Sequence, residues 1–133
     1  MNKVISKDEG SLSILLAGYL ALSVLVGISM AALGLSLIAQ NRIQAVADSA
    51  VLYAHDRSVK KGEPNLEKLR TNAANFLQLA PSAKELSIVS FQVSIADNES
   101  SLRLCARFTD QLGIAISPGE ICKVAKAKSF RID

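Results

Sequence analysis

The fold depends on one stretch of the chain, Leu12 to Ala39, which reads LSILLAGYLALSVLVGISMAALGLSLIA. No Asp, Glu, Lys, Arg or His occurs between Gly10 and Asn41. About 20 apolar residues are enough for a helix to cross the hydrocarbon core of a bilayer, and this run is longer. In a chain of 133 residues, the rest of the protein is too short to bury such a helix on every side. The sequence therefore predicts a transmembrane helix over residues 11–41.

Two other interpretations of this stretch stay open: a buried core helix and a cleaved secretory signal. Lys3 and Lys7 lie where a signal peptide carries its positive charge. However, the apolar region of a signal peptide has only about 7–15 residues. The one small-x-small sequence, Ser29-Met30-Ala31, lies inside continued hydrophobicity. These features favour a retained anchor over both alternatives.

The composition outside this stretch is that of an ordinary polar protein. The whole chain has a mean hydropathy of +0.28 and no Trp. Because no second charge-free stretch of spanning length exists, the sequence excludes a polytopic transporter. The polar part is also too short for a large soluble enzyme domain. The net charge of +3 is too small to indicate nucleic-acid binding.

Small residues recur every four positions along the predicted membrane helix, at Ser23, Gly27 and Ala31. Such a stripe lets helix backbones approach closely and associate within lipid. We expect these three residues to pack against another helix, either in a second copy or in a different subunit. The alternative is composition alone, because small residues are common in membrane helices.

The helical pattern continues beyond the apolar stretch, and this predicts an amphipathic stem over residues 42–58. Its apolar positions follow the period of one helix face: Ile43, Val46, Ala47, Ala50, Val51 and Ala54. After an interruption at Lys60 to Pro64, a second helix should begin at Pro64 or Asn65 and end before Pro81. The predicted apolar face of this second helix contains Leu66, Leu69, Ala73, Phe76 and Leu77.

The remainder of the chain alternates with a period of two, which indicates strands with one buried face. A β-hairpin is predicted, with a turn at residues 97–100 and these inward positions: Val89, Phe91, Val93, Ile95, Leu102, Leu104, Ala106 and Phe108. A third short strand is expected at residues 112–116 and a last one from Ile121 to about Lys128. The predicted fold class is α+β, with a long helix, a second helix and a small antiparallel sheet of three to four strands.

The two cysteines lie in the polar part of the chain, on two of the predicted strands. A disulfide between Cys105 and Cys122 would stabilise a small domain by about 3 kcal/mol. It would also place the polar part outside the cytoplasm. Two buried reduced thiols are the alternative interpretation. We therefore expect residues 59–133 to form a small extracytoplasmic α+β domain and residues 1–10 a cytoplasmic segment.

No recognisable catalytic, metal or cofactor site occurs in the sequence. His55 is the only histidine, and its neighbours Asp56 and Arg57 are typical of a solvated helix end. No phosphate-binding loop, zinc spacing or nucleophile elbow is present. A basic run near the C-terminus is interpreted as a solvated strand face, with anionic lipid or an envelope polymer as an alternative contact: Lys123, Lys126, Lys128 and Arg131. We expect a non-enzymatic protein without cofactor or metal.

The order of these features resembles the TadE/TadG-like pseudopilins. The resemblance is closest to the short TadE-like proteins of actinobacterial Flp (tight adherence) pilus and secretion clusters. It rests on Gly10 just before the apolar helix and on residues 42–50, RIQAVADSA, which supply the stem motif of Arg42, Ala45, Asp48 and Ala50.

The resemblance implies a single-pass membrane protein that serves as a minor pilin or assembly component of a type IV pilus-related secretion system. Its partners would be the bilayer and other pilin-like or Tad assembly subunits. A prepilin peptidase would cleave between Gly10 and Ser11, although Leu15 stands where pilins usually carry Glu. The alternative function is a signal-anchored or secreted extracytoplasmic binding domain unrelated to pili.

Overall fold

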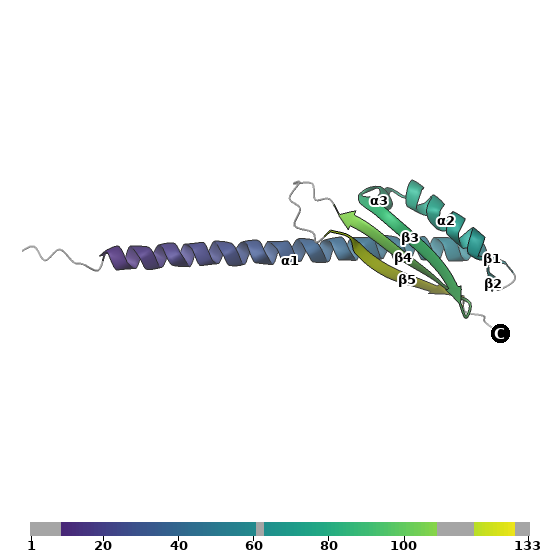
Figure 1. Cartoon of the computed structure of the whole chain (residues 1–133), viewed down its shortest axis with the longest axis horizontal. Helices are drawn as coiled ribbons and strands as arrows, with labels where there is room; N and C mark the ends of the chain where they lie inside the picture. The colour runs from purple at the N-terminus through teal and green to yellow at the C-terminus, as the bar shows by residue number, and fades with distance from the viewer. Residues whose placement is uncertain (1–8, 61–62, 109–118, 130–133) are drawn as a thin grey trace, which may run out of the picture. The chain divides into compact units, whose positions relative to one another are not determined.

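The computed structural model describes residues 9–60, 63–108 and 119–129. It confirms the predicted α+β fold class (Figure 1). The chain divides into two compact units between Gly34 and Leu35. The elements in chain order are α1 (Glu9–Ser58), β1 (Val59–Lys60), β2 (Glu63–Pro64), α2 (Leu66–Leu79), α3 (Pro81–Lys84), β3 (Leu86–Ala96), β4 (Glu99–Phe108) and β5 (Ile121–Lys128).

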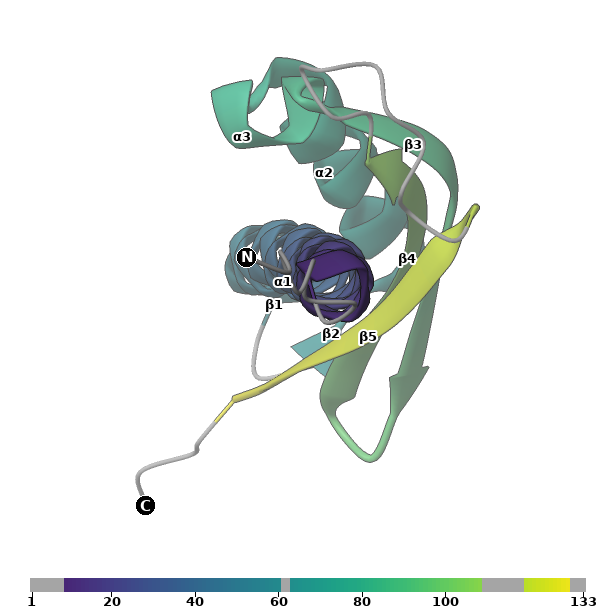
Figure 2. The ribbon, with the colours of Figure 1, turned by 90° about the vertical axis from the view of Figure 1, so that its left-hand side faces the viewer.

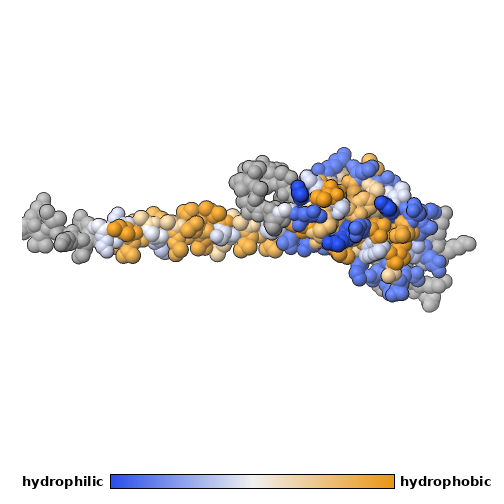
Figure 3. Space-filling model, viewed as in Figure 1, coloured by the Kyte–Doolittle hydropathy of each residue, from blue (hydrophilic) through white to orange (hydrophobic). Residues whose placement is uncertain are grey.

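The first unit consists of the apolar half of α1, which leaves its side chains uncovered. Every residue from Gly10 to Ala31 is exposed, and Figure 3 shows apolar side chains along this part of the helix. Its most apolar window has a mean hydropathy of 2.2 and no buried residue. Among the described residues, α1 is the one helix long and apolar enough to cross a membrane. This agrees with a single membrane anchor, as the sequence predicts.

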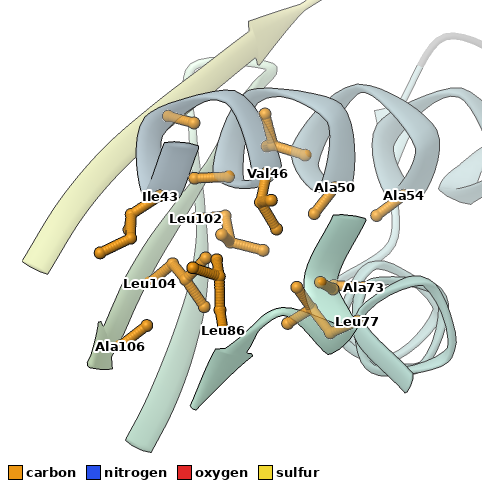
Figure 4. Packing of buried hydrophobic residues seen from close by; sticks show 14 of the residues in the cluster. Ile43, Val46, Ala50, Ala54, Ala73, Leu77, Leu86, Leu102, Leu104 and Ala106 are labelled. Carbon is orange, nitrogen blue, oxygen red and sulfur yellow. The ribbon is translucent and has the colours of Figure 1, made fainter. Parts of the chain in front are cut away.

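In the second unit, the remaining part of α1 and helix α2 lie on the same face of a three-stranded sheet (Figure 2). The sheet has the order β3-β4-β5, and both strand pairs are antiparallel. The predicted stem face is buried here, because Ile43, Ala47 and Ala50 are fully inaccessible to solvent. They pack with Leu102 and Leu104 of β4, which are also fully buried (Figure 4). The small alanines let the helix lie close to the sheet.

Helix α2 begins where the sequence predicts, with Asn65 as its N-cap. The Asn65 side chain accepts a hydrogen bond from the backbone N–H of Lys68, at 3.1 Å, which satisfies one free amide of the first turn. Leu69, Ala73 and Leu77 are buried. The expectation that Leu66 belongs to the buried face of this helix is wrong, because Leu66 is 52% exposed at the first position of α2.

The hairpin turn between β3 and β4 is built from Asp97 and Asn98. Their φ angles are 51° and 60°, a conformation that Asp and Asn tolerate better than most residues. Two such residues in succession match the right-handed twist of the flanking strands. The predicted turn is therefore confirmed, with Glu99 and Ser100 already in β4.

The alternation along β3 is broken near its start by a shift in register between Ile88 and Ser90. This bulge turns Val89 outward, and its side chain is 49% exposed, so the expectation that it faces the core is wrong. The sequence did not indicate the short β1–β2 ladder, which pairs Val59 with Pro64. The strand expected at residues 112–116 lies outside the described residues.

Candidate functional site

The stripe of small residues lies on an exposed part of α1. Ser23, Gly27 and Ala31 are all exposed, and a Cβ atom built on Gly27 would meet no other atom within 4 Å. The Ser23 hydroxyl donates to the Leu20 carbonyl at 2.9 Å, so its polar hydrogen is already bonded within the helix. This lowers the cost of placing the serine in an apolar medium. Among the described residues, the stripe is therefore exposed, which suits a lipid or helix environment.

The expected processing position lies at the start of α1. Gly10 is exposed within the helix, and Ser11 follows it, also exposed. A Cβ atom on Gly10 would meet no other atom within 4 Å, so nothing in the described chain covers this turn. Cleavage after Gly10 stays a prediction.

The structure divides the stem motif between the core and the surface. Ala50 is fully buried in the core. Arg42 is exposed, and its guanidinium donates to the Glu85 carboxylate at 2.7 Å. Since both side chains are more than half exposed, this ion pair adds at most about 1 kcal/mol. Its main effect is positional, because it joins the start of the stem to the residue just before β3.

The other two motif residues lie on the exposed side of the stem. Asp48 accepts a hydrogen bond at 2.8 Å from the side-chain amide of Gln44, which also donates to the Val124 carbonyl at 3.3 Å. Asp48 thus orients a glutamine that connects the stem to β5. Ala45 is exposed.

A shallow pocket of about 230 Å³ lies beside Arg42 and Ala45. Its other lining residues come from the stem and from the segment around α3: Val46, Ser49, Ser82 and Glu85. The lining contains the Arg42–Glu85 ion pair and two serine hydroxyls, but no histidine or cysteine.

The two cysteines form a disulfide between neighbouring strands. Cys105 of β4 and Cys122 of β5 lie directly opposite each other, and their sulfurs are 2.09 Å apart. The predicted pairing agrees with this geometry. The disulfide lies on the sheet face opposite α1 and α2, since Cys105 alternates with the buried Leu104 and Ala106.

His55 occupies a buried position that the sequence interpretation missed. Only 7% of the residue is exposed, whereas a solvated helix end was expected. Its Nδ1 lies 2.7 Å from the Ser100 hydroxyl and its Nε2 lies 2.7 Å from the Ser129 hydroxyl. Its spacing of four residues from Val51 was the one sequence signal for burial. Because Ser100 is fully buried, this cluster is suited to holding three elements together.

The basic run near the C-terminus is split by the alternation of β5. Lys123 faces α1, and its ammonium donates to the Gln40 side chain at 3.2 Å. Lys126 and Lys128 are exposed on the opposite face, and Lys126 pairs with Glu99 at 2.9 Å. Arg131 lies outside the described residues. The lysines therefore do not form one continuous basic face.

Taken together, the candidate functional surface of this chain is the uncovered apolar part of α1 and the stem that follows it. Comparisons with models of protein families, with curated proteins and with solved structures found no match.

Proposed function

We propose that this chain is a single-pass membrane protein that serves as a TadE-like minor pilin or assembly component of a Flp/Tad pilus-related system. Its N-terminus lies in the cytoplasm and its α+β unit outside. In this role the protein holds and positions other subunits and catalyses no reaction.

The observation that carries the proposal is that the two parts of α1 differ in burial. One helix of 50 residues leaves its first part uncovered and apolar, and buries its second part under a sheet. A helix of this kind exchanges lipid for neighbouring helices at little cost, because both surroundings are apolar and packing decides the outcome. A subunit that leaves a membrane to join an assembly needs this property.

The disulfide supports the proposed orientation. Cys105 and Cys122 are paired in the second unit, and structural disulfides persist mainly in oxidising compartments. An external second unit requires the N-terminus of a single-pass chain to stay inside. The positive-inside pattern gives little help, because lysines and arginines occur on both sides of the apolar stretch.

A topology fusion tests the proposal. Alkaline phosphatase, which is active only outside the cytoplasm, is joined to the C-terminus of the full chain, and green fluorescent protein is joined in a parallel fusion. We expect phosphatase activity in the membrane fraction and no fluorescence. The matched control is the same pair of fusions placed directly after Lys7, before the apolar stretch, which should give the reverse result. Fluorescence from the C-terminal fusion would contradict both the orientation and the pilin role.

The alternative, an anchored binding domain unrelated to pili, predicts the same topology. Neighbouring genes separate the two functions. A secretion ATPase and its membrane platform encoded beside this chain would support the pilus role, and an isolated gene would favour the binding domain.

A further inference from the structure

The two sulfurs of the disulfide differ in how far the sheet covers them. Cys105 is 6% exposed and lies on β4, the central strand. Ser90 of β3 pairs with it on one side and Cys122 of β5 on the other. Cys122 lies on an outer strand and is accessible to solvent. A molecule that approaches this face of the sheet therefore reaches the Cys122 sulfur more readily than the Cys105 sulfur.

The charged groups around the two sulfurs differ as well. Arg103 and Arg107 are both exposed and lie two positions before and after Cys105, on the same face of β4. The Glu120 carboxylate lies 3.7 Å from the Cys122 sulfur and within 4.8 Å of the Cys105 sulfur. Neighbouring cations stabilise a cysteine thiolate, and a neighbouring carboxylate opposes it. A thiolate is therefore better stabilised at Cys105, between the two arginines, than at Cys122.

Both differences favour one direction of thiol–disulfide exchange. The rate of this reaction depends on access to the attacked sulfur and on how readily the other sulfur leaves as a thiolate. We propose that Cys122 is the sulfur through which this disulfide is made and exchanged, and that Cys105 is its resolving cysteine. The partner is a dithiol protein of the kind that makes or breaks disulfides. This assignment does not depend on the pilus role.

The same mixed disulfide, between Cys122 and the partner, forms in both directions of the reaction. When the bond is broken, a partner thiolate attacks the Cys122 sulfur, the bond to Cys105 breaks, and Cys105 leaves with the electron pair and takes a proton from water. The partner's second thiolate then attacks the partner sulfur of the mixed disulfide and releases Cys122 as a thiolate. Two electrons pass from the partner, which becomes a disulfide, to the two cysteines. When the bond is made, these steps run in reverse, and Cys122 attacks the partner's disulfide first.

The test uses the full, oxidised chain in detergent micelles and reduced glutathione as the attacking thiol. The reaction is stopped at short times with excess N-ethylmaleimide, which blocks free thiols and preserves mixed disulfides. Mass spectrometry of the fragments that contain β4 and β5 then locates the two groups. We expect glutathione on Cys122 with maleimide on Cys105 at least about tenfold more often than the reverse arrangement, because access and leaving-group stability favour the same sulfur.

Charges of opposite sign beside the disulfide should change the rate in opposite directions. Glu120→Gln removes the carboxylate near Cys122, so the rate of disulfide loss to glutathione should rise about threefold at low ionic strength. Arg107→Gln removes a cation beside Cys105 and should slow the reaction by about twofold. Both side chains are exposed, so both variants should keep the fold, which circular dichroism checks.

Two positions on α2 provide matched controls. Glu67→Gln and Arg70→Gln make the same charge changes at exposed positions of this helix, away from the two cysteines in the sheet. Both controls should react with glutathione at the rate of the unchanged chain.

Three results would overturn the proposal. The first is glutathione mainly on Cys105, which would exchange the roles of the two cysteines. The second is an equal amount of glutathione on both cysteines, or no mixed disulfide while the fold is intact, which would mean that the bond reacts only after the second unit unfolds. The third is an equal rate for Glu120→Gln and Glu67→Gln, which would show that attack does not occur beside the carboxylate.

Discussion

At the scale of single residues, the polar cluster around His55 links parts of the second unit that lie far apart in the sequence. His55 belongs to the last turns of α1, Ser100 is the second residue of β4, and Ser129 directly follows β5. One imidazole ring therefore connects the stem with two strands through its two nitrogens. Burial of polar side chains such as His55 and Ser100 is costly unless each finds a partner, and here each ring nitrogen of His55 has one.

Replacing this ring should destabilise the second unit. His55→Ala leaves the fully buried Ser100 hydroxyl without its partner and opens a small cavity, so we expect a loss of about 1–3 kcal/mol in the free energy of unfolding. Urea unfolding of the full chain in detergent measures it through the fluorescence of Tyr53, which packs against Phe76 with ring centroids 5.4 Å apart. Asp56→Ala, at an exposed neighbour, is the control and should be close to neutral. Equal midpoints for both variants would show that the cluster contributes nothing.

At the scale of elements, periodicity was enough to predict the stem, α2, the hairpin and β5. Each of these has a clear apolar face, and the turn residues Asp97 and Asn98 mark the hairpin by their own chemistry. Two of the misses, at Val89 and at His55, share one cause, which is that burial depends on neighbours distant in sequence. The bulge at Val89 depends on pairing with β4, and the burial of His55 depends on hydroxyls 45 and 74 residues away. Periodicity within one element carries no information about such partners.

The same limit applies to the candidate site. The exposed small-residue stripe could be located from the sequence, since spacing alone places Ser23, Gly27 and Ala31 on one face. The different roles of Arg42 and Ala50 within one motif could not, because they depend on where α3 and the sheet lie against the stem. The unequal access to the two cysteine sulfurs is likewise a property of the packed unit.

The disulfide joins β4, the second strand of the hairpin, to β5, the last strand. Its removal should therefore loosen β5. For a sequence separation of 17, the loop-entropy model gives about 3 kcal/mol. We expect Cys105→Ser combined with Cys122→Ser to lower the free energy of unfolding by up to this amount, measured by urea unfolding of the full chain in detergent. Unchanged protein treated with dithiothreitol is the control and should match the double variant. If the double variant unfolds at the midpoint of the oxidised protein, the backbone pairing with β4 and the side-chain packing hold β5 without help from the disulfide.

At the scale of the whole molecule, one long helix belongs to both compact units. No residue of its most apolar window is buried, and its second part carries much of the core of the second unit. The core cluster residues of α1 all lie beyond the apolar part, from Ile43 onward. In the proposed role, this separation would let the same folded unit be presented from a bilayer or from an assembly of helices, whichever packs the apolar part better.

If helix packing decides whether the apolar part of α1 contacts lipid or other helices, the small-residue stripe should control association in the membrane. Gly27→Leu places a large side chain in the middle of the stripe. Close packing and not hydrophobicity drives helix association in lipid. We therefore expect this variant to reduce crosslinking of the full chain, to itself or to partner subunits in native membranes, at least about fivefold. Gly18→Leu is the matched control. Gly18 lies nine positions away, on the opposite face of the helix at 3.6 residues per turn, and a Cβ atom there also meets no other atom within 4 Å. The two variants have the same composition and hydropathy, so a loss confined to Gly27→Leu assigns the interface to the stripe. Equal crosslinking in both variants would mean that the stripe reflects only the ordinary composition of a membrane helix, and the association surface would then have to lie in the stem or the sheet.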